Sequence, residues 1–219
     1  MPELIPAILT NDISDFRKKY AELFALSSYF TKLHVDFIDG EFLPNPTIQP
    51  IDLDSFKSPL ILMAHFMAFK PADYFIQIKK IGFQWGLIQY EAFYSQDSVL
   101  ESIEQGKQLG LQMGISVNPE TSLDDISKIL PKVSLVQVMG VHPGSQGREF
   151  VKGTLEKIKE LKKKSRTVII SIDGGIKPGL ALECAAAGAD WIVIGSAILN
   201  SKHPKEMLDQ FKREMESGS

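Results

Sequence analysis

Four residues whose side chains could bind a metal ion or transfer a proton lie at the ends of apolar segments that are far apart in the sequence. His34 and Asp36 occur in Leu-His-Val-Asp, His65 occurs in Ile-Leu-Met-Ala-His-Phe-Met, and Asp173 follows Val-Ile-Ile-Ser-Ile. Two imidazoles and two carboxylates suit Zn²⁺, Fe²⁺, Mn²⁺ or Co²⁺, and the order of metal affinities does not choose among these ions. The carboxylates can also act as an acid and a base. The pattern predicts an enzyme with one divalent metal ion.

Short apolar segments alternate with amphipathic ones along the 219 residues, and most of the apolar segments lack polar alternation. This is typical of parallel strands that are covered on both faces. The predicted strands are Leu4–Leu9, Leu33–Phe37, Leu60–Ala64, Gly86–Tyr90, Gln112–Val117, Leu135–Met139, Thr167–Ile172 and Trp191–Ile194, and predicted helices include Asp73–Ile81, Asp97–Leu109, Phe150–Lys164 and Leu180–Ala187. Eight strands with helices between them favour a closed (β/α)8 TIM barrel of α/β class over an open doubly wound sheet, which the periodicity alone does not exclude.

No linker rich in Gly, Ser or Pro divides the chain, so we predict one domain over residues 1–219 with a frayed tail at 215–219. In a (β/α)8 barrel the chemistry gathers at the C-terminal ends of the strands. His34 and Asp36 are two positions apart on one strand, so their side chains point to the same side. Met67 and Met139 also end strands; we interpret them as core residues that would form an apolar floor if they face the rim.

Glycines follow the last strands and suggest a second kind of site. Gly144 and Gly147 lie in a loop after Pro143, Gly174-Gly175 follows Asp173, and Gly195-Ser196 ends the eighth predicted strand. Each pair is ordinary alone, but together they fit a phosphate site made of backbone N–H groups, which this fold often provides.

Several other polar residues are interpreted as structural. Asp39 precedes Gly40 and is predicted to be a turn residue. Arg148 and His142 are interpreted as loop residues, and the segment Lys157–Lys164 as the water-facing side of a helix. Cys184 has no histidine or other base near it in its Ala-rich segment, so a nucleophilic role is not expected.

The overall composition limits the classes of binding partner that we expect for this protein. A net charge of −3 gives no reason to expect nucleic acid, which would favour a basic face. No apolar stretch approaches the roughly 18 residues that span a bilayer, so no membrane partner is expected. No signal peptide is visible, and the single cysteine fits a reducing compartment. We therefore expect a cytoplasmic protein that acts on a small molecule, with association into a homo-oligomer through the barrel helices as a further expectation.

The sequence resembles the ribulose-phosphate 3-epimerase family over nearly its full length. The matching segments are Ile5–Leu9, His34–Gly40, Phe42–Asn45, His65–Met67, Tyr90–Ala92, Asn118–Thr121, Met139–Gly144, Asp173–Ile176, Ala187–Asp190 and Gly195–Ile198. The resemblance implies a ribulose-phosphate-binding (β/α)8 barrel that holds one divalent metal ion. It assigns the metal ligands as His34, Asp36, His65 and Asp173, and the phosphate site as Gly147, Gly175, Gly195 and Ser196.

The resemblance also implies a reaction of the pentose phosphate pathway, the interconversion of D-ribulose 5-phosphate and D-xylulose 5-phosphate. A metal ion on the ketone and the neighbouring hydroxyl oxygen would stabilise a cis-enediolate. Inversion at C3 then needs one proton-transferring group on each face of this planar intermediate. Asp36 and Asp173 are the expected pair, and their protonation states must differ in each direction.

The chain departs from the family pattern at several positions. Ala7 replaces the usual serine, Gln146 lies where the glycine-rich loop commonly reads Gly-Phe-Gly-Gly-Gln, Ile38 replaces a frequent methionine, and Gln89 lies where histidine is common. None of these changes removes an expected metal ligand or the acid–base pair. They leave open a hexulose 6-phosphate epimerase of the D-allulose 6-phosphate type, for which Ala7 offers more room, and a catalytically silent barrel that binds a phosphosugar.

Overall fold

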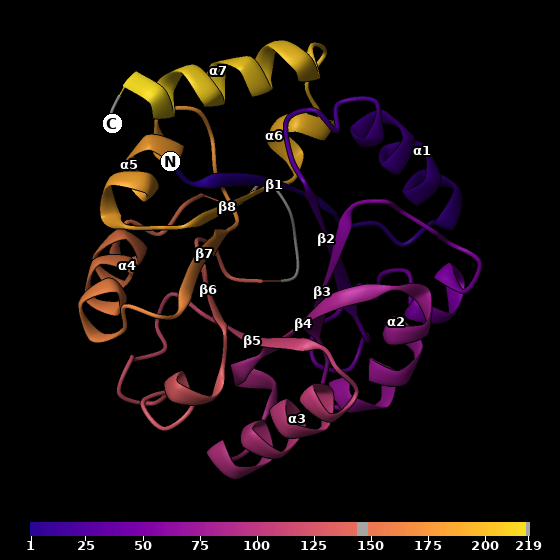
Figure 1. The fold of residues 1–219 in the computed structure, drawn as a ribbon, viewed down its shortest axis with the longest axis vertical. Helices are drawn as coiled ribbons and strands as arrows, with labels where there is room; N and C mark the ends of the chain where they lie inside the picture. The colour runs from indigo at the N-terminus through magenta and orange to yellow at the C-terminus, as the bar shows by residue number, and fades with distance from the viewer. Residues whose placement is uncertain (144–148, 218–219) are drawn as a thin grey trace.

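The computed structural model of the protein describes residues 1–143 and 149–217, and its eight parallel strands close into a barrel in chain order. Figure 1 looks down on this barrel and shows the helices arranged around it. The strands are β1 (Glu3–Ile8), β2 (Lys32–Ile38), β3 (Ile61–Met67), β4 (Phe83–Gln89), β5 (Gln112–Val117), β6 (Leu135–Met139), β7 (Ile169–Asp173) and β8 (Trp191–Ile194). The predicted (β/α)8 barrel is confirmed, and the open sheet is excluded.

The helical layer is less regular than the strands. The α-helices are α1 (Ile13–Phe24), α2 (Phe75–Ile81), α3 (Gln96–Gln108), α4 (Gly153–Lys164), α5 (Leu180–Ala187), α6 (Ser196–Leu199) and α7 (Pro204–Ser217). Within residues 39–60 and 118–134, all of which are described, the crossovers β2–β3 and β5–β6 contain turns and short 3₁₀ helices but no α-helix. No helix in the described part of the chain is long and apolar enough to cross a membrane.

The chain is helical up to the last residue that the structure describes. Helix α7 extends to Ser217, and the side chain of Met215 is 2% exposed. Burial of this methionine against the apolar core stabilises the last helical turns. The predicted tail covers residues 215–219, of which 218 and 219 lie outside the described residues, and it stays a prediction.

The apolar strands are explained by two separate cores. Leu33, Val35 and Phe37 of β2 belong to the outer core, which contains helix residues such as Phe16 of α1. The alternate positions of the strands face the barrel interior, where Ile5, Ala7, Met63, Leu87, Leu135, Trp191 and Val193 form the second core. Because both faces of each strand are covered, hydrophobic residues occur at consecutive positions.

The barrel interior is apolar at one end and polar at the other. Trp85 and Trp191, near the starts of β4 and β8, pack edge to face with ring centroids 5.2 Å apart. Toward the C-terminal ends, the inward positions carry His34, Asp36 and His65 among other buried polar residues. The tryptophans fill the N-terminal end, and functional groups are concentrated at the C-terminal rim.

Candidate metal centre and active site

Strand register brings the four predicted ligands together. Asp36 on β2 is paired directly with His65 on β3, and His34 lies two residues before Asp36 on the same face. Candidate ligand atoms from these three residues and Asp173 all lie within 4.8 Å of one another. The carboxylate oxygen Oδ1 of Asp36 is 3.1 Å from His34 Nε2 and 2.9 Å from His65 Nδ1. Asp173 Oδ2 lies 3.8 Å from His34 Nε2.

Asp173 is placed by a tight contact between the ends of β6 and β7. The backbone N–H of Gly140 donates to the carbonyl oxygen of Asp173 at 2.6 Å. A Cβ atom at Gly140 would lie 2.4 Å from the carbonyl oxygen of Gly174, and Gly174 itself has a φ of 103°. Only glycine tolerates both the close approach and the left-handed backbone, so these two positions hold the backbone that carries the Asp173 side chain.

The electrostatics of the site separate the two carboxyl groups. Burial works to raise the pKa of Asp36, but the charges and hydrogen bonds of His34 and His65 outweigh it and hold this pKa well below its usual range. Burial and then the negative charge of Asp36 raise the pKa of Asp173 to about 6. Burial also opposes protonation of His34, yet the carboxylates of Asp36 and Asp173 raise the pKa of that ring above its ordinary value. The site stabilises positive charge between the carboxylates.

The donor set and its spacing fit a divalent metal ion. Both histidines are fully buried, and an uncompensated cluster of carboxylates and imidazoles in such a position would be unfavourable. Two nitrogen and two oxygen ligands within one small volume match the preferences of Zn²⁺, Fe²⁺, Mn²⁺ and Co²⁺. His34, Asp36, His65 and Asp173 are thus a candidate metal centre.

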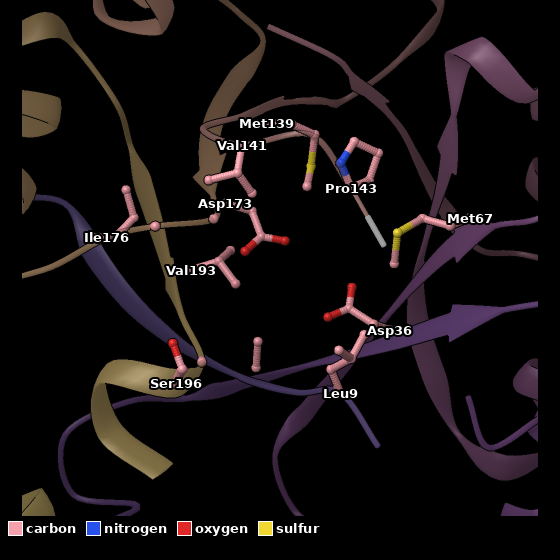
Figure 2. A pocket seen from close by; sticks show the side chains of 14 residues that line it. Leu9, Asp36, Met67, Met139, Val141, Pro143, Asp173, Ile176, Val193 and Ser196 are labelled. Carbon is pink, nitrogen blue, oxygen red and sulfur yellow. The ribbon is translucent and has the colours of Figure 1, made fainter. Parts of the chain in front are cut away.

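A pocket of about 600 Å³, part of it open to solvent, lies above this centre. Figure 2 shows the carboxylates of Asp36 and Asp173 pointing toward one another across the pocket, with the side chains of Met67 and Met139 beside them. The described lining residues are Ala7, Leu9, Asp36, Met67, Met139, Val141, Pro143, Asp173, Gly174, Gly175, Ile176, Val193, Gly195 and Ser196. Both methionines therefore face the rim, as an apolar surface beside the acid–base candidates.

The predicted phosphate residues are partly brought to this pocket. Gly174, Gly175, Gly195 and Ser196 line it on the side of β7 and β8. The backbone N–H of Gly174 is a donor to the Asp173 carboxylate, so it also supports the acid–base candidate. Gly144 and Gly147, together with Gln146 and Arg148, lie outside the described residues.

Sequence reasoning overlooked a second layer of polar residues behind the metal centre. The side chain of Gln137 on β6 is fully buried, and its Nε2 lies 3.3 Å from Asp173 Oδ2. Gln89 was noted above only as a departure from the family pattern. Its Oε1 accepts from His65 Nε2 at 3.0 Å. Their spacing in the sequence could have revealed that both glutamines face the barrel interior. Gln89 lies two residues after Leu87, and Gln137 lies two residues after Leu135; both leucines point inward from apolar strands.

The interpretation of Lys157–Lys164 as a water-facing surface is wrong for its first residue. The Lys157 ammonium donates to the carbonyl oxygens of Asn118, Pro119 and Thr121 at 2.8, 2.5 and 2.5 Å. Burial outweighs the neighbouring carboxylates and lowers the pKa of Lys157. This lysine ties helix α4 to the loop after β5, a tertiary contact that the local charge pattern does not reveal.

The other residues interpreted as structural make ordinary structural contacts. Asp39 Oδ1 accepts from the backbone N–H groups of Glu41 and Phe42, as a turn residue does. His142 is exposed, 3.4 Å from Glu120. Burial raises the pKa of the Cys184 thiol to about 12, which suppresses the thiolate that a nucleophile needs.

The fold and site together define a (β/α)8 barrel with a candidate metal centre and two opposed carboxylates at the C-terminal rim. A family model described as the ribulose-phosphate 3 epimerase family matches residues 3–199. The chain belongs to this family, whose class is that of the carbohydrate epimerases, which are isomerases.

Individual relatives agree with this family membership. The chain is 30% identical to the cytoplasmic isoform of ribulose-phosphate 3-epimerase from Oryza sativa subsp. japonica, with 98% of this chain and 94% of the relative covered. It is also 30% identical to ribulose-phosphate 3-epimerase of Escherichia coli strain K12, with 97% and 95% covered. A mutant tryptophan synthase alpha-subunit from Pyrococcus furiosus has a TM-score of 0.72 at 16% identity, covering 98% of both chains. This last likeness bears on the fold alone.

Proposed function

We propose that this protein is a metal-dependent epimerase that inverts C3 of a ketose phosphate, with D-ribulose 5-phosphate and D-xylulose 5-phosphate as its substrate pair. The observation that carries the proposal is the pair of carboxylates, Asp36 and Asp173, which face one another across a pocket beside two buried histidines. An epimerase needs proton-transferring groups on opposite faces of a planar intermediate. Membership of the ribulose-phosphate 3-epimerase family supports the choice of substrate.

The two aspartates would exchange protons with C3 from opposite sides. One ionised aspartate removes the C3 proton, and the other, protonated, returns a proton to the opposite face; the reverse reaction exchanges these roles. The site supports unequal protonation, since the histidines depress the pKa of Asp36 while burial and the neighbouring carboxylate raise that of Asp173. One carboxylate and one carboxylic acid can therefore coexist near pH 6.

His34, His65 and the two aspartates would hold the divalent metal ion. When bound, the ion supplies Lewis acidity that stabilises the negative charge developing on the substrate oxygens. The residues themselves do the positioning: strand pairing holds Asp36 against both imidazoles, and the Gly140–Gly174 contact holds Asp173. Met67 and Met139 exclude water from the side of the pocket where the proton is transferred.

The phosphate group of the substrate would bind on the side of β7 and β8. Gly174, Gly175, Gly195 and Ser196 line this part of the pocket, where backbone N–H groups and one hydroxyl are suitable donors. The predicted contribution of Gly144 and Gly147 stays a prediction. The cytoplasmic location, the lack of a nucleic-acid partner and the homo-oligomer are likewise predictions.

One observation favours a second candidate within the same chemistry. Ala7 lines the pocket, where a methyl group leaves more space and offers no hydrogen bond to a sugar hydroxyl. A hexulose 6-phosphate of the D-allulose type, one carbon longer, would use that space. The two candidates differ in kcat/KM for pentulose and hexulose phosphates measured side by side.

Solvent exchange tests the proposed reaction directly. Zinc-loaded protein is incubated with D-ribulose 5-phosphate in deuterated water, and C3 is followed by NMR. Deuterium at C3 together with xylulose 5-phosphate is the expected result. Absence of exchange with this substrate, but exchange with a hexulose 6-phosphate, would select the second candidate. If folded, metal-loaded protein shows no exchange with either the pentulose or the hexulose phosphate, the remaining candidate is a catalytically silent barrel that binds a phosphosugar.

A further inference from the structure

We infer that Gln89, the last residue of β4, is a positioning residue that fixes the tautomer and the ring orientation of His65. The inference rests on the proposed metal centre and assigns to this chain's own glutamine a role in building it. The side chain of Gln89 is fully buried, and its Oε1 lies 3.0 Å from His65 Nε2. Gln89 is not itself one of the four ligand candidates, so it would act on the metal only through His65.

The other end of the Gln89 amide determines which way the group is oriented. Its Nε2 lies 2.5 Å from Glu91 Oε2 and 3.0 Å from Asn118 Oδ1. A carboxylate only accepts hydrogen bonds, so the NH₂ of Gln89 must face Glu91. The flipped amide would place two oxygen acceptors against each other in a buried position. Oε1 therefore faces His65, and it can only accept.

Glu91 is in turn held by the segment after β5. Its Oε1 accepts from the backbone N–H of Asn118 at 2.7 Å and from the hydroxyl of Thr121. The carbonyl oxygens of Asn118 and Thr121 accept from the Lys157 ammonium, as described above. A continuous set of hydrogen bonds thus extends from helix α4 through this loop to Glu91, Gln89 and His65. The amide of Gln89 is fixed by partners on both sides, which is what a positioning residue requires.

The orientation of Gln89 has a direct consequence for His65. Since Oε1 accepts, the Nε2 of His65 carries a hydrogen and donates it. In the neutral ring the lone pair then lies on Nδ1, 2.9 Å from the carboxylate oxygen of Asp36. The amide nitrogen of Gln137 lies 3.5 Å from the same Nδ1, a long contact that also presents a donor to a lone pair. Two acceptors at 2.9 Å are favourable only with a proton or a metal ion between them. Nδ1 is therefore the atom that would exchange its proton for the metal.

The two histidines of the centre differ in this respect. His34 presents Nε2 to the carboxylates, and its Nδ1 has no hydrogen-bond partner among the described residues. His65 presents Nδ1 and is held from behind through Nε2. Outer partners of metal-binding histidines typically contribute about 10–100-fold to metal affinity. Gln89 is the outer partner of His65, so we expect it to make that contribution to metal affinity.

The test compares Gln89→Met with Gln84→Met in otherwise full-length protein. Gln84 lies at the other end of the same strand, where its Oε1 accepts from the backbone N–H of Leu62. It is exposed, and it serves as the control for loss of a glutamine hydrogen bond in β4 away from His65. Zinc affinity is measured by competition with a chromophoric chelator. Gln89→Met should weaken binding about 10–100-fold, and Gln84→Met should leave it unchanged. Circular dichroism of the metal-free variants checks that both fold.

A second measurement needs no variant. In zinc-loaded wild-type protein with ¹⁵N-labelled histidine, long-range ¹H–¹⁵N correlation should show His65 protonated at Nε2 and without a proton at Nδ1. A His65 ring protonated at Nδ1 would overturn the inference, as would zinc binding by Gln89→Met that equals the wild type. If the wild type itself binds no zinc, the proposed metal centre fails and this inference with it. Tight wild-type binding with an unaltered variant refutes the role of Gln89 alone.

Discussion

The rim formed by β2 to β5 and the rim formed by the loops after β7 and β8 present their functional groups in different ways. On the first side, side chains such as His34, Asp36 and His65 project from strands and are held by further side chains. On the second side, Gly174, Gly175, Gly195 and Ser196 present mainly backbone to the pocket. Substitutions on the first side should change chemistry and metal affinity, whereas substitutions on the second should act through backbone conformation and substrate affinity.

The largest effect is expected from a substitution of Asp173, the residue that lies between the two sides. Asp173→Asn removes a carboxyl group that the proposal requires for proton transfer, and general acid–base groups typically contribute about 10²–10⁴-fold to rate. We expect kcat for D-ribulose 5-phosphate to fall by about 10³-fold, with the fold retained. A coupled assay of xylulose 5-phosphate formation measures the change. Near-normal turnover in this variant would remove Asp173 from the acid–base pair.

A backbone substitution on the second side should have the next largest effect. In Gly174→Ala the new methyl group would meet Val141 Cγ2 at 2.6 Å on a backbone with φ of 103°. We expect the free energy of unfolding in urea to fall by about 1–3 kcal/mol, the usual cost of such backbone strain. Gly153→Ala is the matched control, because its Cβ would meet nothing within 4 Å at the start of α4 and alanine favours the helix. Equal stability of Gly174→Ala and wild type would contradict the strain argument.

The separated pKa values predict how the stability of the metal-free protein depends on pH. The pKa of Asp173 is raised to about 6 in the folded state, above its ordinary value of about 3.9 in the unfolded chain. Its contribution to stability is therefore complete below pH 4 and is lost as the pH rises through about 6. Asp36 has the opposite sign: its depressed pKa stabilises the fold above pH 4, and this is lost in more acidic solution.

Asp173→Asn isolates the first of these contributions. In EDTA the variant should be more stable than wild type at pH 8 by about 3 kcal/mol, because the buried charge is gone. The difference should shrink as the pH falls toward 4, where Asp173 is neutral in the folded state, and disappear at lower pH, where it is neutral in the unfolded chain as well. Urea unfolding at several pH values provides the measurement. A stability difference that does not vary between pH 4 and pH 8 would mean that burial does not raise the pKa of Asp173.

The smallest effect is expected from removal of the Ser196 hydroxyl, on the side of the pocket formed by the loops after β7 and β8. Ser196→Ala removes a proposed phosphate donor and leaves the metal centre intact, so KM should rise several-fold, equivalent to about 1 kcal/mol, with kcat little changed. Inhibition by inorganic phosphate should weaken in parallel. A fall in kcat at constant KM would instead connect Ser196 to the chemical step.

The fold was predictable because its signal is local and repeated. Covered parallel strands need apolar residues on both faces, so β5, β6 and β8 have the bounds that were predicted, as does helix α5. The local pattern was a poor guide where a distant contact overruled it. Lys157 belongs to a charged helical segment, yet it is half-buried because its ammonium donates to carbonyl oxygens of the loop after β5. Met215 belongs to a polar terminus, yet it is buried.

The residues that could form the centre are recognisable without the structure, because histidine and aspartate at inward positions of buried strands are costly without a partner. His34, Asp36, His65 and Asp173 were identified in this way. Tertiary structure decided their mutual geometry: parallel register pairs Asp36 with His65 across 29 positions of sequence, and barrel closure brings Asp173 within 3.8 Å of His34. It also decided the role of Gln89, since the orientation of an amide depends on the partners at both of its ends, and these come from separate parts of the chain.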